Sequence, residues 1–186
     1  MHRATICIAG LVLSTNLIVL AELSHAQENS QQESAATIRL DFPPEKSIGF
    51  LEIFEERNPD LRALLSKESR SLSAVGSLTI PKDSFVSLKV GKDGDLSFLG
   101  QLPADSLHRL HIRDRDLDAD AFKLITRFSS LRVLELNGCR ISENAFRSAS
   151  VIESLQRLEV SMQDESEKQH VKSLAAWAAS LPNLEY

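Results

Sequence analysis

The stretch Leu131-Arg-Val-Leu-Glu-Leu-Asn-Gly-Cys-Arg-Ile141 is the one that decides the expected fold. It reads L-x-x-L-x-L-x-x-C-x-I, and in an extended strand Leu134 and Leu136 point to the same face. The residues that alternate with them point to the opposite face: Val133, Glu135 and Asn137. One such strand cannot bury its apolar face alone, so we expect stacked copies at a fixed period.

The pattern recurs on both sides of this stretch. Leu107–Ile112 and Leu155–Val160 carry the same leucine spacing, and 131 − 107 and 155 − 131 both give 24 residues. The segments that follow the first two strands repeat at the same distance, with Asp118 and Ser142 as expected N-caps of short helices. The sequence therefore predicts strand–turn–helix units.

These units resemble leucine-rich repeats, nearest to the cysteine-containing class, over about Leu107 to Ser161. Arg115 and Gln163 stand where the central copy has Cys139. The resemblance implies an α/β fold, a short leucine-rich-repeat solenoid with parallel strands on the concave face and helices on the convex face. It also implies protein–protein interaction, with no partner identity. Together with the absence of Asn-x-Ser/Thr sequons, it favours an exported bacterial protein.

A second, longer repeat precedes these units. Pro44-x-x-Ser-Ile-x-x-Leu-x-Ile53 matches Pro81-x-x-Ser-Phe-x-x-Leu-x-Val90 at an offset of 37 residues, and a strand-like segment precedes each copy. We expect residues 38–106 to form two degenerate repeats, each with an additional strand, that cap the solenoid of residues 107–186.

The first residues are typical of an export signal. Arg3 precedes an apolar run from Ala4 to Leu20, and Ser24-His-Ala26 offers the small residues that a signal peptidase recognises. The sequence predicts a signal peptide over residues 1–26, a disordered linker over 27–37, and a periplasmic or secreted protein. An uncleaved membrane anchor is the alternative; after cleavage no membrane span is expected.

Composition and motifs offer little chemistry. The net charge is −5, and the sequence lacks the basic stripe that is typical of a nucleic-acid-binding protein. Cys7 would be removed with the signal, and Cys139 is expected to be a buried, small apolar residue. We find no phosphate-binding loop, no metal-spaced cluster and no nucleophile motif, so we expect no catalytic residues, no metal, no cofactor and no enzymatic activity.

The 24-residue offset predicts which outward side chains lie side by side on parallel strands. The candidate binding residues are Arg109, His111, Arg113, Val133, Glu135, Asn137, Arg157 and Glu159. We expect replacement of Glu135 with alanine to be nearly neutral for folding, and this face could be only a solvated polar surface. If it binds, the two glutamates and the flanking arginines suit a mixed-charge protein partner of unknown identity.

Two further functions remain open at this stage. The chain could be a structural or assembly component of the cell envelope that stacks through its C-terminal edge. A ubiquitin-ligase substrate adaptor would fit cysteine-containing repeats but conflicts with an export signal. The preferred hypothesis is a non-enzymatic binding module that uses the concave face.

Overall fold

The computed structural model describes residues 36–56, 68–161 and 171–185. Residues from Ala36 onward belong to one compact unit. The expected signal peptide and nearly all of the expected linker lie outside the described residues. Within the described ranges, no helix is long and apolar enough to cross a membrane.

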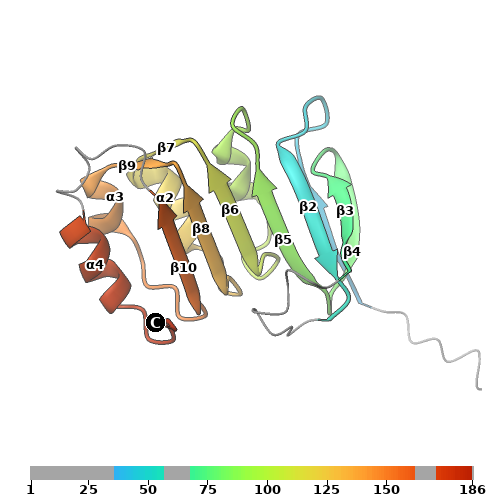
Figure 1. Ribbon diagram of the computed structural model, residues 1–186. Helices are drawn as coiled ribbons and strands as arrows, with labels where there is room; N and C mark the ends of the chain where they lie inside the picture. Colours follow the sequence, from blue (N-terminus) through green and yellow to red (C-terminus); the bar gives the residue numbers. More distant parts are fainter. Residues whose placement is uncertain (1–35, 57–67, 162–170, 186) are drawn as a thin grey trace, which may run out of the picture. The chain divides into compact units, whose positions relative to one another are not determined.

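The centre of the fold is a six-stranded mixed sheet with the order β10-β8-β6-β5-β2-β3 (Figure 1). Its strands are β2 (Gly49–Phe54), β3 (Arg70–Ser73), β5 (Phe85–Val90), β6 (Arg109–Arg113), β8 (Val133–Asn137) and β10 (Arg157–Ser161). β5, β6, β8 and β10 are successive parallel neighbours. β2 is antiparallel to both β5 and β3.

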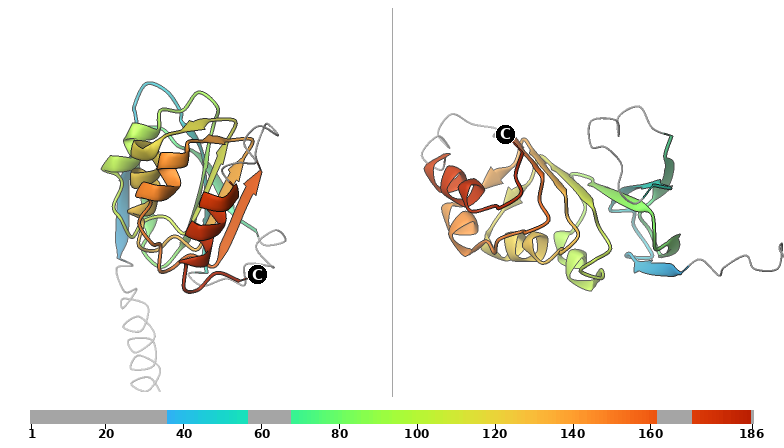
Figure 2. Two further views of the ribbon diagram at one scale, coloured as in Figure 1. Left: turned by 90° about the vertical axis from the view of Figure 1, so that its left-hand side faces the viewer. Right: turned by 90° about the horizontal axis from the view of Figure 1, so that it is seen from below.

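Two small sheets flank this one. β1 (Thr37–Asp41) pairs antiparallel with β4 (Ser77–Pro81), and the short β7 (Asp116–Leu117) pairs parallel with β9 (Arg140–Ile141). The helices of the described residues are η2 (Leu96–Gln101, a 3-10 helix), α2 (Ala119–Thr126), α3 (Glu143–Ser148) and α4 (Val171–Ala179). All four lie on the same side of the main sheet, as Figure 2 shows. We call the opposite side the helix-free face.

Local capping explains where two of these helices begin. Asp95 accepts a hydrogen bond from the Ser97 amide at the start of η2, and Asp118 accepts one from the Ala121 amide at the start of α2. Ser142 occupies the N-cap position of α3 but its side chain makes no capping bond. The predicted cap at Asp118 is thus confirmed, and that at Ser142 is confirmed in position only.

The main core lies between the sheet and the helices. Leu110, Leu134 and Leu155 are fully buried, as the leucine pattern requires. The ring of Trp177 on α4 packs against Phe122 and Phe146 at centroid separations of 5.4 and 6.1 Å. The helix layer is therefore held together by aromatic contacts that link α2, α3 and α4.

Cys139 belongs to the same core. It is fully buried, and its Sγ lies 3.5 Å from the Ile112 carbonyl oxygen. Burial raises the pKa of this thiol above its usual value, which disfavours the reactive thiolate. The prediction of a buried apolar role for Cys139 is confirmed.

The expected fold, a short leucine-rich-repeat solenoid, is wrong. The described residues form a mixed sheet in which β2 and β3 run antiparallel to their neighbours, with few helices. A solenoid would continue the parallel stacking through residues 38–106. Instead, parallel stacking at the 24-residue offset is restricted to the later strands, where Leu110, Leu134 and Leu158 align in the ladder.

The physical reason lies in the 37-residue repeat. Leu51 and Leu88 occupy matching places in its two copies, and they are direct partners in the antiparallel ladder between β2 and β5. Leu40 and Leu78 belong to the strand segments that precede the two copies; they are 38 residues apart and are likewise direct antiparallel partners. Equivalent residues that pair antiparallel are related by a two-fold rotation, whereas a solenoid relates its copies by a translation. The expected N-terminal cap is therefore a two-fold pair of strand–turn–strand units.

Candidate functional site

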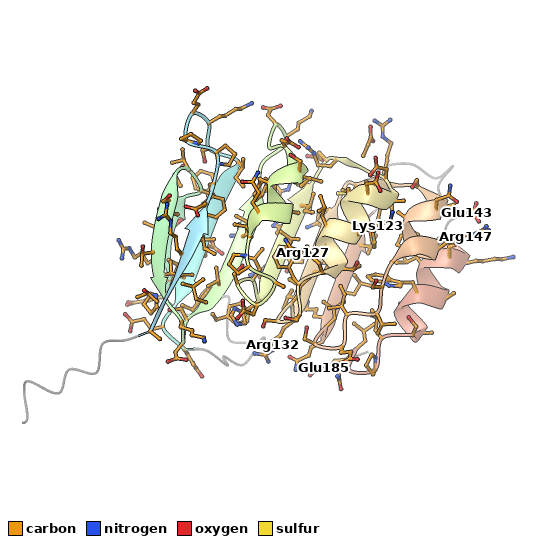
Figure 3. All side chains as sticks on the ribbon, turned by 180° about the vertical axis from the view of Figure 1, so that it is seen from behind. Lys123, Arg127, Arg132, Glu143, Arg147 and Glu185 are labelled. Atoms are coloured by element: carbon orange, nitrogen blue, oxygen red, sulfur yellow. The ribbon has the colours of Figure 1, made fainter. Side chains whose placement is uncertain are left out.

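All eight predicted binding residues lie on the helix-free face. The ladder aligns Arg109 with Val133 and Arg157, His111 with Glu135 and Glu159, and Arg113 with Asn137. The leucines that alternate with them point toward the helices. Figure 3 views the molecule from the helix side, so the helices lie in front of the sheet. The predicted register is confirmed.

At the centre of this face is a buried polar network. Arg109 Nη2 donates to Glu135 Oε1 at 2.7 Å and to Oε2 at 3.0 Å. The side chains of Arg109 and Glu135 are only 13% and 7% exposed. Charge-assisted hydrogen bonds with little solvent competition are among the stronger polar contacts in proteins, so this pair holds β6 and β8 together on their outer side.

His111 completes the network. The Asn137 amide nitrogen lies 3.2 Å from His111 Nε2, and His111 Nδ1 lies 3.7 Å from Glu135 Oε2. When the Asn137 amide donates to Nε2, the neutral His111 ring carries its proton on Nδ1. The Nδ1–H group then points toward Glu135. Burial lowers the pKa of His111; Glu135 acts in the opposite direction, while Arg113, Arg109 and Lys89 act with burial.

Burial corrects two expectations about this face. Val133 is 2% exposed and Glu135 is 5% exposed, so neither presents a surface to a partner. The expected repulsion between Glu135 and Glu159 is also relieved, because each glutamate has its own arginine. Glu159 pairs with Arg157 at 3.2 Å, with both side chains about half exposed. Alternation identified the face correctly but could not show that its centre is closed to solvent.

The 24-residue offset does not predict the part of the face contributed by β2 and β5. There, Lys89 Nζ lies 2.6 Å from Glu52 Oε1, and Phe50 stands 60% exposed. Phe50 is the direct ladder partner of Lys89. The alternation within Gly49–Phe54 carried this signal, because Leu51 and Ile53 face the core while the residues between them do not.

A small aromatic cluster closes one end of the same face. Phe54 and Phe85 form an apolar group separate from the main core, with ring centroids 5.9 Å apart. His108 stacks on Phe85 at 5.1 Å, and the Arg132 guanidinium lies over the same ring at 6.0 Å. Arg132 also donates to the side-chain oxygen of Gln156. This end is occupied by packed side chains.

Arg113 differs from the other charged residues that lie on the strands of this face. Among the described residues, these strands carry on this face four cations (Lys89, Arg109, Arg113, Arg157) and three carboxylates (Glu52, Glu135, Glu159), and each carboxylate pairs with one cation. Arg113 is exposed and, within the described ranges, has no ion-pair partner. The described part of the face can therefore offer the positive charge of Arg113 and the exposed ring of Phe50 to another molecule.

The described residues contain no group of three or more histidine, cysteine or acidic side chains placed to hold a metal ion. Comparison with protein-family models, curated proteins and solved structures finds no match for this chain. The structural class that can be stated is a mixed α/β domain whose six-stranded sheet has one face free of helices.

Proposed function

We propose that the chain is a non-enzymatic protein-binding module and that the helix-free face of its main sheet is the binding surface. The observation that carries this proposal is the pairing pattern. Among the described residues of the face, each carboxylate is neutralised by a neighbouring cation and Arg113 has no ion-pair partner. Phe50, on the same face, is exposed.

The rigidity of the face supports binding. Glu135, Arg109 and His111 are held by mutual contacts and are largely buried, so little side-chain freedom is lost when a partner docks. Phe50 and Arg113 lie on strands separated only by β5, with ladder partners Lys89 and Asn137. Phenylalanine and arginine are both enriched in protein–protein interfaces relative to the rest of the surface.

The chemistry of the partner follows from these two residues. An apolar side chain would cover Phe50, and a carboxylate would pair with Arg113. Such a contact forms at the rim of a paired network, so the charge should affect the association rate and its salt dependence more than the overall affinity. Added salt should weaken the complex.

The test begins with a partner identified by cross-linking to the intact protein and then purified. Arg113→Glu and Phe50→Ser should each weaken its binding at least several-fold. The matched controls are Lys123→Glu, on α2 on the opposite side (Figure 3), and Val151→Ser, between α3 and β10. Val151 is 48% exposed, so the control removes a comparable apolar surface elsewhere. Equal effects of test and control variants would contradict the proposal.

We also propose that the protein is exported, which the N-terminal residues support by their pattern. The expected mature N-terminus is Gln27. Mass spectrometry of the protein from the periplasm or the medium checks this, and a full-length chain kept in the membrane would contradict it.

A further inference from the structure

The free edge of β10 has an unpaired row of backbone groups. Arg157 N–H donates to the Arg132 carbonyl, and Ser161 C=O accepts from Gly138 N–H. The backbone N–H and C=O groups at these alternate positions of β10 therefore point toward β8. Leu158 and Val160 therefore direct their N–H and C=O groups away from the sheet. Within the described part of the chain, no strand pairs with them.

The direction of the next strand beside β10 is already set. The His108 carbonyl accepts from Arg132 N–H at 2.8 Å, and the Arg132 carbonyl accepts from Gln156 N–H at 2.9 Å. The Gln156 carbonyl accepts from Glu185 N–H at 2.8 Å in the same way. Glu185 thus stands beside Gln156 at the start of a parallel position. Among the described strands, none is placed beside Leu158–Ser161.

The opposite edge of the same sheet fits this position. β3 is antiparallel to β2, which is antiparallel to β5, so β3 runs in the same direction as β10. Ala74 N–H donates to the Gly49 carbonyl on β2, so the outward backbone groups of β3 belong to Ser71 and Ser73. A second copy shifted along the sheet would bring its β3 beside β10 in parallel orientation.

Hydrogen-bond direction and side-chain direction agree in one register. With Leu72 beside Val160, the Val160 N–H reaches the Ser71 carbonyl and the Val160 carbonyl receives the Ser73 N–H. In this register Leu72 and Val160 both point to the helix side, where each is half-buried against the main core. In the same register the four residues of β3 lie beside Leu158–Ser161 of β10.

We propose that β10 of one molecule pairs in parallel with β3 of a second copy, so that the chain associates head to tail through its two sheet edges. Such an interface is heterologous and leaves a free β10 and a free β3 at the two ends of every assembly. Neither β3 nor β10 contains a proline, and edges without proline are suited to this type of pairing. This inference is independent of the helix-free face.

The experiment uses two variants that each remove one outward N–H and no bond within the sheet. Val160→Pro blocks the β10 edge and Ser71→Pro blocks the β3 edge, with Val160→Thr and Ser71→Ala as matched controls that keep the N–H. In sedimentation equilibrium, the average molar mass of the wild-type protein should increase with protein concentration. Each proline variant alone should be monomeric at concentrations where its control associates. The dissociation constant for self-association should be about tenfold or more above that of the control.

The decisive measurement is the mixture. Val160→Pro keeps a usable β3 and Ser71→Pro keeps a usable β10, so together they should form a one-to-one complex and nothing larger. A two-fold dimer through β10 alone would persist in Ser71→Pro and would overturn the proposal, as would a wild-type protein that stays monomeric. If circular dichroism shows that Val160→Pro is unfolded, Val160→Lys replaces it, because it keeps the N–H but places a charge in the junction.

Discussion

The two faces of β8 are both buried, but by different means. On one face Leu134 and Leu136 are covered by the helices; on the other, Glu135 is covered by Arg109 and His111. The first face gains stability from apolar area removed from water, and the second depends on matched charges that lose their value when one partner is removed. The comparison shows that alternation along a strand assigns residues to faces without showing which face is wet.

The largest expected effect falls on the apolar face. Leu134→Ala should lower the free energy of unfolding by about 2–5 kcal/mol, because the side chain is fully buried and its neighbours cannot fill the cavity. Chemical denaturation followed by circular dichroism measures this. A loss below about 1 kcal/mol would mean that the helix layer collapses onto the sheet more easily than its aromatic contacts suggest.

The next effect falls on the polar face. The sequence predicts that Glu135→Ala is nearly neutral, and the burial of Glu135 corrects this. The variant should lower the free energy of unfolding by about 1–3 kcal/mol, because it removes the carboxylate that accepts from the buried Arg109. Glu159 occupies the equivalent place on β10 but is about half exposed, so Glu159→Ala should change stability by no more than about 0.5 kcal/mol. Equal losses for the two variants would contradict the difference in burial.

The parallel half of the fold could be predicted because its repeat carries its own geometry. Leucine spacing fixed the strand faces, and the 24-residue offset fixed the register of β6, β8 and β10. The antiparallel half could not be predicted in the same way. A repeat of 37 residues gives the distance between copies along the chain, but both a translation and a two-fold rotation satisfy it. β3 was not expected at all, because Arg70–Ser73 carries a single apolar residue.

The candidate face could be predicted in membership but not in exposure. The burial of Glu135 depends on the reach of Arg109 from the neighbouring strand, which spacing does not reveal. The sequence did not predict Phe50 and Lys89 as part of this face, because their strands belong to the half of the sheet for which parallel stacking was wrongly expected. Their pairing across the sheet depends on β2 running antiparallel to β5.

His111 gives a smaller, pH-dependent effect on the polar face. Burial lowers its pKa in the folded protein below the ordinary value of 6.5, so the unfolded chain binds a proton first as pH falls. This histidine should therefore reduce stability as pH falls through about 6.5, and the loss should stop growing below the folded pKa. Thermal unfolding across this range should show a shallower loss in His111→Gln. An unchanged slope would assign the pH dependence to other groups.

The smallest expected effect on stability is that of replacing Arg113. This residue lies at the exposed rim of the polar face, whereas Arg109, Glu135 and His111 form its buried centre. Reversing the charge of Arg109 would place a second carboxylate beside Glu135 inside a buried site, so that variant would fail for structural reasons whether or not the face binds anything. Arg113 is exposed and unpaired within the described ranges, so Arg113→Glu should change the free energy of unfolding by no more than about 0.5 kcal/mol. Removal of a neighbouring cation should also raise the pKa of His111 slightly, because Arg113 lowers it in the wild-type protein. Denaturation together with a nuclear magnetic resonance titration of the His111 ring measures both quantities. A large loss of stability would show that Arg113 has a structural partner and belongs to the centre, and a binding test based on it would then lose its meaning.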